Sequence, residues 1–88
     1  MYRLVTSNRF KKRLRDFLRQ HTDLRVVTRE KLLLLQLNPQ TTSLKTHKLT
    51  GKLKAFFACS ITYEYRLVFD VKDREIHLLA IGTHDEVY

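Results

Sequence analysis

The side chains best suited to moving a proton near neutral pH include a histidine in the C-terminal stretch "IGTHDEVY". His84 follows an expected strand directly, and two acids and Tyr88 come after it. Imidazole exchanges protons at neutral pH, and a neighbouring carboxylate or phenol can orient its ring. The stretch therefore predicts a proton-transfer group at the end of the last strand. A frayed tail without function is the alternative.

A second candidate group lies in "YEYRLVF", which has the composition of a β-strand. Glu64 and Arg66 are two residues apart, so an extended backbone turns both to one face and Tyr65 to the other. Burying a charged group is costly, so an arginine in such an apolar strand indicates an open cleft or a partner. A surface pair between Arg66 and Glu64 is the alternative, and it would contribute little to stability.

The third candidate stretch is the basic loop "THKLTGKLK". His47 offers a second proton-transfer group, and Lys48, Lys52 and Lys54 can bind phosphates. A solvated basic loop is the alternative. No paired spacing such as HExxH or CxxC and no glycine-rich phosphate loop occurs, so we expect neither a metal site nor a cofactor.

Composition and charge limit the possible functions. The chain has 88 residues and a net charge of +8, which suits one domain over residues 1–88. Residues 1–54 hold 14 bases and three acids, a balance of +11, whereas residues 55–88 have a balance of −3. The basic part favours a polyanion or an acidic protein as partner. A single cysteine, no long apolar run and no leader-like N-terminus predict a soluble, cytoplasmic protein without membrane contact.

The N-terminal part predicts a strand followed by two helices. Residues 2–5 are short, apolar and β-prone, and Ser7 or Asn8 can cap a helix after them. The helix has one apolar stripe, which consists of Phe10, Leu14, Phe17 and Leu18. Its opposite face is basic and carries Arg9, Lys11, Lys12, Arg13, Arg15 and Arg19. A second helix fits residues 24–38, because Pro39 cannot continue it.

The hydrophobic period changes to two in the C-terminal part. Residues 55–62, 64–71 and 75–82 are expected strands, and the polar "KDRE" predicts an antiparallel hairpin between the last two. The order is β-α-α-β-β-β. It predicts an α+β fold with a helical hairpin packed on one face of a small, mainly antiparallel sheet. The other face would remain open to a substrate.

This order and three motifs together resemble the RelE/ParE superfamily of bacterial toxins. The motifs are "HKLTGKLKAFF", "YEYRLVFDV" and "IGTHDEVY", and the first and last most resemble the YafQ-like branch. The resemblance implies a RelE-like fold and the toxin of a type II toxin–antitoxin system. It also implies a metal-independent endoribonuclease, an mRNA interferase that cleaves mRNA on the ribosome and is neutralised by a cognate antitoxin.

The resemblance also implies roles for individual residues. His47 and His84 match the histidines of the YafQ-like active site, Glu64 matches an acidic residue, and Arg66 matches the strand arginine of other branches. Contacts to RNA are expected from Lys48, Lys52, Lys54, Tyr65, Tyr88 and Arg13. The chain departs from the family at Ser60, where a further catalytic histidine is expected, so proton transfer is expected to be shared out differently here.

A different class of function remains open at this stage. Toxins of the ParE type share the fold, bind DNA gyrase and need no nuclease site. The combination of His47, Arg66 and His84 is unusual for that type and favours the nuclease.

Overall fold

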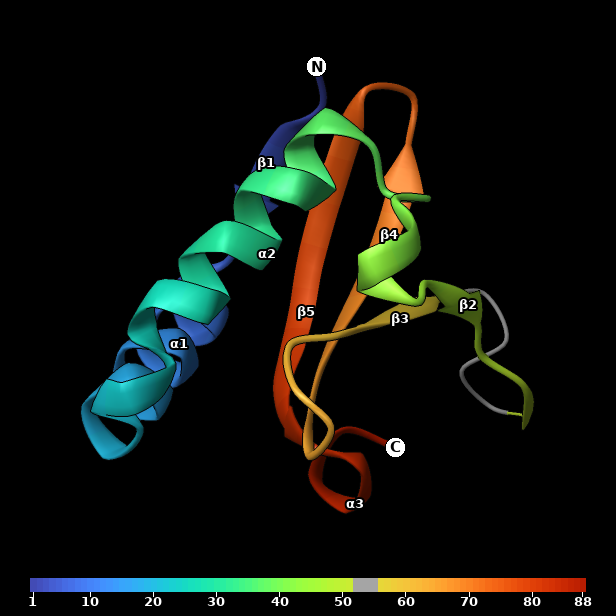
Figure 1. The fold of residues 1–88 in the computed structure, drawn as a ribbon. Coiled ribbons are helices and arrows are strands. Elements are labelled where there is room, and N and C mark those ends of the chain that lie inside the picture. The colour runs from blue at the N-terminus through green and yellow to red at the C-terminus, as the bar shows by residue number, and fades with distance from the viewer. Residues whose placement is uncertain (52–55) are drawn as a thin grey trace.

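The computed structural model describes residues 1–51 and 56–88. Figure 1 shows two helices lying along one side of a sheet, with the C-terminal helix at one end of it. The elements, in chain order, are β1 (Arg3–Thr6), α1 (Asn8–Gln20), η1 (Thr22–Leu24), α2 (Arg25–Leu37), η2 (Thr42–Leu44), β2 (His47–Lys48), β3 (Phe57–Ser60), β4 (Tyr65–Lys72), β5 (Glu75–Thr83) and α3 (His84–Val87).

The start of α1 is determined by a side-chain cap. The hydroxyl of Ser7 accepts a hydrogen bond from the backbone N–H of Phe10 at 3.0 Å, which satisfies one of the free donors of the first turn. Such a cap stabilises a helix by about 1 kcal/mol. The sequence left Ser7 and Asn8 as alternatives, and the structure selects Ser7.

The core lies between the two long helices and one face of the sheet. Phe10 of α1 and Leu35 of α2 pack with Leu67, Phe69 and other strand residues in one cluster. Phe69 is completely buried, and burying a side chain of this size contributes about 1.5–3 kcal/mol. The apolar stripe of α1 therefore faces the sheet as predicted, and Lys and Arg occupy its exposed side.

The sheet has five strands in the order β1-β5-β4-β3-β2. β1 pairs with β5 in parallel, and the other three pairings are antiparallel. The predicted α+β fold and the hairpin between β4 and β5 are confirmed. The structure adds four short elements that the pattern did not predict: the 3₁₀ helices η1 and η2, the two-residue strand β2 and the helix α3.

The face of the sheet opposite the long helices carries only a small apolar cluster. Leu49, Ala58 and Val68 form it, and Val87 of α3 packs against them. This face is the open face predicted from the sequence, partly covered by α3, which lies at the lower end of β4 and β5 in Figure 1. In the described part of the chain no helix has the length and apolar character needed to cross a membrane.

Candidate active site

The pairing of the strands aligns the candidate residues on the open face. Ser60 of β3 pairs with Arg66 of β4, and Arg66 pairs with Gly82 of β5. His47 of β2 pairs with Ala58, which shares a face with Ser60 because the two are two residues apart. The alternation that buries Leu67 among the core residues therefore turns Arg66 to the opposite side.

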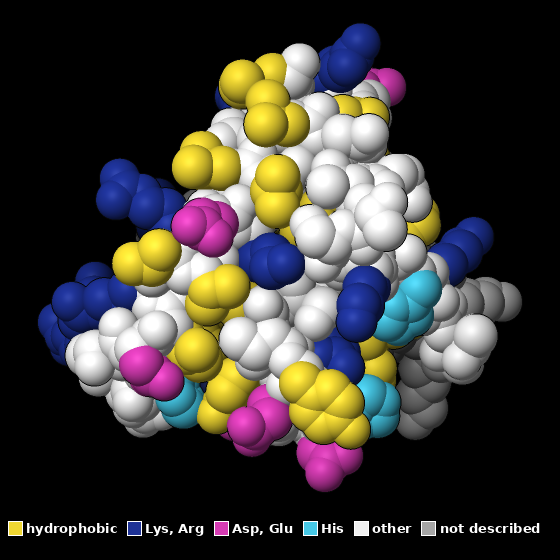
Figure 2. Space-filling model, in the orientation of Figure 1, with side chains coloured by type: hydrophobic (Ala, Val, Ile, Leu, Met, Phe, Trp, Pro, Cys, Tyr) yellow, Lys and Arg dark blue, Asp and Glu magenta, His cyan; other side chains and the backbone are white. Residues whose placement is uncertain are grey.

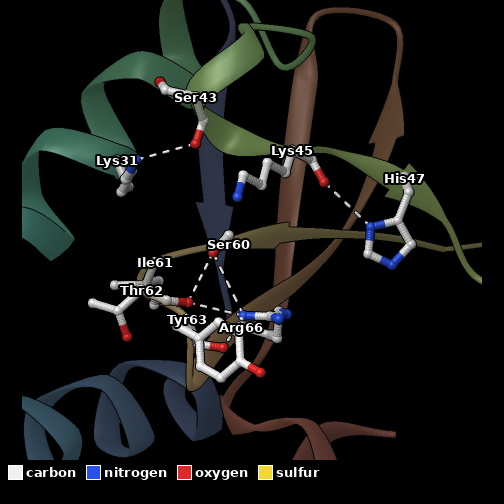
Figure 3. Close-up of a pocket in the computed structure, with 9 residues that line it drawn as sticks. All are labelled: Lys31, Ser43, Lys45, His47, Ser60, Ile61, Thr62, Tyr63 and Arg66. Carbon is white, nitrogen blue, oxygen red and sulfur yellow. Dashed lines mark hydrogen bonds between the residues drawn. The ribbon is translucent and has the colours of Figure 1, made fainter.

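The guanidinium of Arg66 is held by the turn between β3 and β4. Its Nη1 donates to the backbone oxygens of Thr62 and Tyr63, both at 2.8 Å, and lies 3.5 Å from the hydroxyl of Ser60 (Figure 3). Within residues 1–51 and 56–88, no other nitrogen of this side chain makes a hydrogen bond. The group is therefore anchored through one nitrogen, and its other N–H donors can bind a phosphate.

His47 is connected to the C-terminus by a hydrogen bond. Its Nδ1 lies 3.2 Å from the backbone oxygen of Lys45, and its Nε2 lies 3.4 Å from the hydroxyl of Tyr88. A carbonyl oxygen can only accept, so Nδ1 carries the proton and Nε2 of the neutral ring is the acceptor. The hydroxyl of Tyr88 then donates to Nε2. This arrangement leaves a basic nitrogen at the edge of the open face.

The C-terminal residues form a short capped helix rather than a frayed tail. The hydroxyl of Thr83 accepts from the backbone N–H of Glu86 at 3.3 Å, and the Glu86 carboxylate accepts from the backbone N–H of Thr83 at 2.8 Å. This reciprocal pair is a capping box. Gly82 leaves room for it, because a Cβ atom there would lie 3.0 Å from Oε1 of Glu86.

The capped helix brings His84 close to Tyr88. Their ring centroids are 4.2 Å apart in an edge-to-face arrangement, and Nδ1 of His84 lies 3.5 Å from a carboxylate oxygen of Asp85. Partial burial raises the pKa of Tyr88, while the charge of Arg66 acts in the opposite direction. His47, Tyr88 and His84 therefore form one continuous group beside Arg66.

Acid should loosen this tail. The carboxylate of Glu86 accepts a hydrogen bond from the backbone N–H of Thr83, and this bond holds the pKa of Glu86 below its ordinary value of 4.5. Since the folded-state pKa is the lower one, Glu86 stabilises α3 fully above pH 4.5, and that contribution is lost as the pH falls through the folded-state pKa. We expect the amide proton of Thr83 to shift in this acid range in an NMR titration, and Glu86→Gln to remove the shift. A Thr83 amide that is insensitive to acid in the unaltered protein would contradict the capping role.

The site is hollowed into a pocket of about 580 Å³. Its lining residues come from α2, from η2 and the segment after it, and from the β2–β4 region: Lys31, Ser43, Lys45, His47, Ser60, Ile61, Thr62, Tyr63 and Arg66. Figure 3 shows the amino groups of Lys31 and Lys45 on the side of the pocket opposite Arg66. The pocket is thus lined by cations, hydroxyls and an imidazole.

Glu64 and Tyr65 lie elsewhere. The strand β4 begins at Tyr65, one residue after Glu64, so the predicted alignment of Glu64 with Arg66 on one strand is not formed. Glu64 is exposed in the bend before β4 and does not line the pocket. Tyr65 faces the helices and packs against Phe17 and His21, with ring centroids 5.1 and 4.8 Å apart. Neither side chain is brought together with Arg66.

The remaining predicted RNA contacts are dispersed. Arg13 and Tyr65 both line a smaller hollow of about 280 Å³ between the end of α1 and the start of α3. Lys48 is exposed on β2 and pairs with Phe57, so it points away from the site face. Lys52 and Lys54 lie outside the described residues.

Six of the nine pocket residues were not singled out from the sequence: Lys31, Ser43, Lys45, Ile61, Thr62 and Tyr63. Lys31 belongs to a helix whose pattern indicates only an amphipathic surface, and Lys45 belongs to a loop. Tyr63 is 93% exposed and lies in the bend before β4. Only the folding of α2 and η2 against the strands brings these side chains together.

Cys59 is not a nucleophile. It is fully buried between the sheet and the helices, and burial raises the pKa of its thiol to about 12. The thiol is therefore protonated at neutral pH, and Cys59 acts as a packing residue. In the described ranges, no group of three or more His, Cys, Asp and Glu side chains could hold a metal ion.

Comparison with known proteins identifies related chains. A family model described as bacterial toxin of type II toxin–antitoxin system, YafQ, matches residues 2–88. A copper-bound mutant toxin from Helicobacter pylori is 34% identical with a TM-score of 0.82, and each chain is covered completely. YafQ from E. coli is 19% identical with a TM-score of 0.82, covering 100% of this chain and 99% of that one.

A further similar structure contains two proteins. It is the DinJ–YafQ complex of E. coli, whose matching chain is 19% identical with a TM-score of 0.75, covering 100% of this chain and 99% of that one. Among curated proteins, no match was found.

Proposed function

Since this chain belongs to the YafQ family of bacterial type II toxins, we propose that it cleaves messenger RNA on the ribosome, in the cytoplasm, and that a cognate antitoxin neutralises it. One observation carries the nuclease assignment. Arg66 and His47 line one pocket, and Tyr88 links His47 to His84. A cation together with two proton-transfer groups is the set of side chains that RNA cleavage requires.

The proposed reaction is an internal phosphoryl transfer. The 2′-oxygen of a nucleotide attacks the adjacent phosphorus as its proton passes to a base. The bond to the 5′-oxygen of the next nucleotide breaks, and an acid protonates that oxygen. The products are a 2′,3′-cyclic phosphate and a free 5′-hydroxyl. Negative charge grows on the phosphate oxygens in between and needs a nearby cation.

His47 and His84 can divide the proton transfers between them. The hydrogen bond of Nδ1 to the Lys45 oxygen leaves the lone pair of His47 Nε2 as the base, once the 2′-hydroxyl takes the place of the Tyr88 hydroxyl there. His84 contacts the ring of Tyr88 and has the Asp85 carboxylate 3.5 Å from its Nδ1, so it is the candidate for the acid. The exposed position of Glu64 outside the pocket favours His47 over Glu64 as the complement of His84.

Arg66 supplies the positive charge, and exposed aromatic rings can hold a base. The N–H groups of Arg66 that do not bind the turn can face the phosphate. Tyr63 and Tyr88 are exposed at the site and can stack on nucleobases. Because these side chains supply a base, an acid and a cation, the proposed reaction runs without a metal ion.

A translating extract tests this function. Purified protein should produce primer-extension stops inside the reading frame of a translated mRNA, and no such stops when initiation is blocked. A chelator selective for zinc and copper, which leaves the ribosomal Mg²⁺ in place, should not change the rate. Growth arrest without any cleavage would remove the nuclease assignment and favour a toxin that acts only by binding, such as one directed at DNA gyrase.

The surface of α2 supports the antitoxin as partner. Val26, Leu33 and Leu37 are 70%, 55% and 61% exposed, and their spacing places them on one side of the helix. Figure 2 shows hydrophobic side chains running over α2 with Lys and Arg at their margin. An antitoxin segment with apolar and acidic side chains would cover this stripe and pair with the charges around it.

An acid placed in this stripe should weaken the complex. We expect Leu33→Asp to raise the dissociation constant of the toxin–antitoxin complex about tenfold or more, because a charge would be buried in an apolar contact. Leu79→Asp is the control, since Leu79 is also exposed but lies on β5, outside the stripe. Calorimetry measures the dissociation constant of the antitoxin for each of the two variants. Equal affinities for Leu33→Asp and Leu79→Asp would place the antitoxin elsewhere.

A further inference from the structure

The pocket beside Arg66 contains a second group of cations that the proposed cleavage step does not use. Lys31 reaches it from α2, and Lys45 reaches it from the segment between η2 and β2 (Figure 3). The pocket extends from these two amines, past Ser60, to the guanidinium of Arg66. It is therefore longer than a site for one phosphate group needs to be.

The charges of this pocket are not balanced by the protein. Lys31, Lys45 and Arg66 line it together, and none of its nine lining residues is acidic. The ion pairs between described residues involve Arg3, His77 and His84 as the bases, and none of these three cations. Like charges around one hollow raise its positive potential, which favours an anion with more than one negative group. Lysine, arginine and histidine side chains are also seen close together on this face (Figure 2).

The two lysines are positioned in different ways, Lys31 by a hydrogen bond of its side chain and Lys45 by the conformation of its own backbone. Lys31 is half-buried, and its Nζ donates to the backbone oxygen of Ser43 at 3.1 Å, which leaves further donors of the ammonium free for a ligand. Lys45 has a left-handed backbone with φ of 52°, which costs a lysine roughly 1–2 kcal/mol. The same bend turns its carbonyl oxygen to His47 while its side chain enters the pocket.

We propose that Lys31 and Lys45 bind the phosphate next to the scissile one, so that two successive phosphates of the RNA occupy the pocket. This inference rests on the proposed function for the identity of the ligand. Two anchored phosphates fix the direction of the strand across the open face. They also hold the 2′-oxygen in line with the bond to be broken, which is a positioning role for both lysines. A trinucleotide is then the shortest RNA that fills the site.

Three trinucleotides test the assignment without any cleavage. All carry 2′-O-methyl groups, so they cannot react. One has two normal phosphates, and each of the others has one phosphate replaced by an uncharged methylphosphonate. NMR titration should show that the unaltered protein binds either substituted trinucleotide about tenfold more weakly than the charged one, because each loses a charge-assisted contact.

The double variant Lys31→Gln with Lys45→Asn separates the two phosphates. Glutamine retains a donor for the Ser43 oxygen, and asparagine tolerates the left-handed backbone, so the fold should persist. This variant should still bind one substituted trinucleotide about tenfold more weakly than the charged one, because Arg66 still contacts the phosphate that is replaced in it. It should bind the other substituted trinucleotide as well as it binds the charged one. Lys72→Gln is the control, because it removes an exposed charge at the far end of β4. It should bind both substituted trinucleotides about tenfold more weakly than the charged one.

Three outcomes would overturn the assignment. They are no measurable binding of the charged trinucleotide, equal binding of all three by the unaltered protein, and both penalties persisting in the double variant. The extract assay separates this result from the proposed function. A protein that cleaves no translated mRNA would refute the nuclease, whereas the titration still decides whether the two lysines bind a second phosphate.

Discussion

Replacing Arg66 with alanine should lower the rate of mRNA cleavage about a hundred- to a thousand-fold, which is typical for the loss of one group that stabilises transition-state charge. The side chain lies on the open face and outside the core cluster, so its loss leaves the packing of the sheet unchanged. Antitoxin binding should remain nearly intact for the same reason. Primer extension in the translating extract gives the rate.

Two further measurements distinguish this role from a structural one. Arg66→Lys should restore little activity, because an ammonium cannot both hold the oxygens of Thr62 and Tyr63 and present a planar fork to a phosphate. Circular dichroism of Arg66→Ala should match that of the unaltered protein, with a modestly lower melting temperature from the looser turn. An unfolded Arg66→Ala protein would instead make Arg66 a structural residue.

The His84→Ala and His84→Gln proteins should bind the ribosome normally and cleave about a hundred- to ten-thousand-fold more slowly, the range expected for a group that transfers a proton. His84 is 66% exposed, so neither change disturbs the core. Asp85→Asn should have a smaller effect, because Asp85 touches only the ring of His84. Single-turnover cleavage and ribosome co-sedimentation measure the two properties separately.

If the C-terminal residues were a tail without function, removing them would leave the rate of cleavage unchanged. A chain ending at Gly82 lacks α3, Tyr88 and the hydrogen bond to His47, so it should be inactive. If the ring of Tyr88 stacks on a base, Tyr88→Ala should weaken cleavage by about 1–3 kcal/mol, which is less than the effect of His84→Ala. Full cleavage by the truncated chain would remove the tail from the site and leave His47 and Arg66 without an acid.

Most of the fold could be predicted from the amino-acid pattern. Periodicity and capping placed α1, α2 and the three long strands to within a few residues, because the core face of each element must bury its apolar side chains. The same alternation predicted that Arg66 and Leu67 face opposite sides of the sheet, which the core confirms. The resemblance to the RelE/ParE superfamily, and to its YafQ-like branch, is confirmed by the family to which the chain belongs.

The assembly of the site, in contrast, depends on how whole elements pack. The two-residue strand β2 is too short to leave a pattern in the sequence, yet its pairing with β3 places His47 within 3.4 Å of the Tyr88 hydroxyl. Glu64 is separated from Arg66 because the bend before β4 ends the alternation between them. Lys31 and Arg66 are far apart along the chain, and they line the same pocket only because α2 packs on the sheet. Such contacts depend on the packing of whole elements, which local periodicity does not encode.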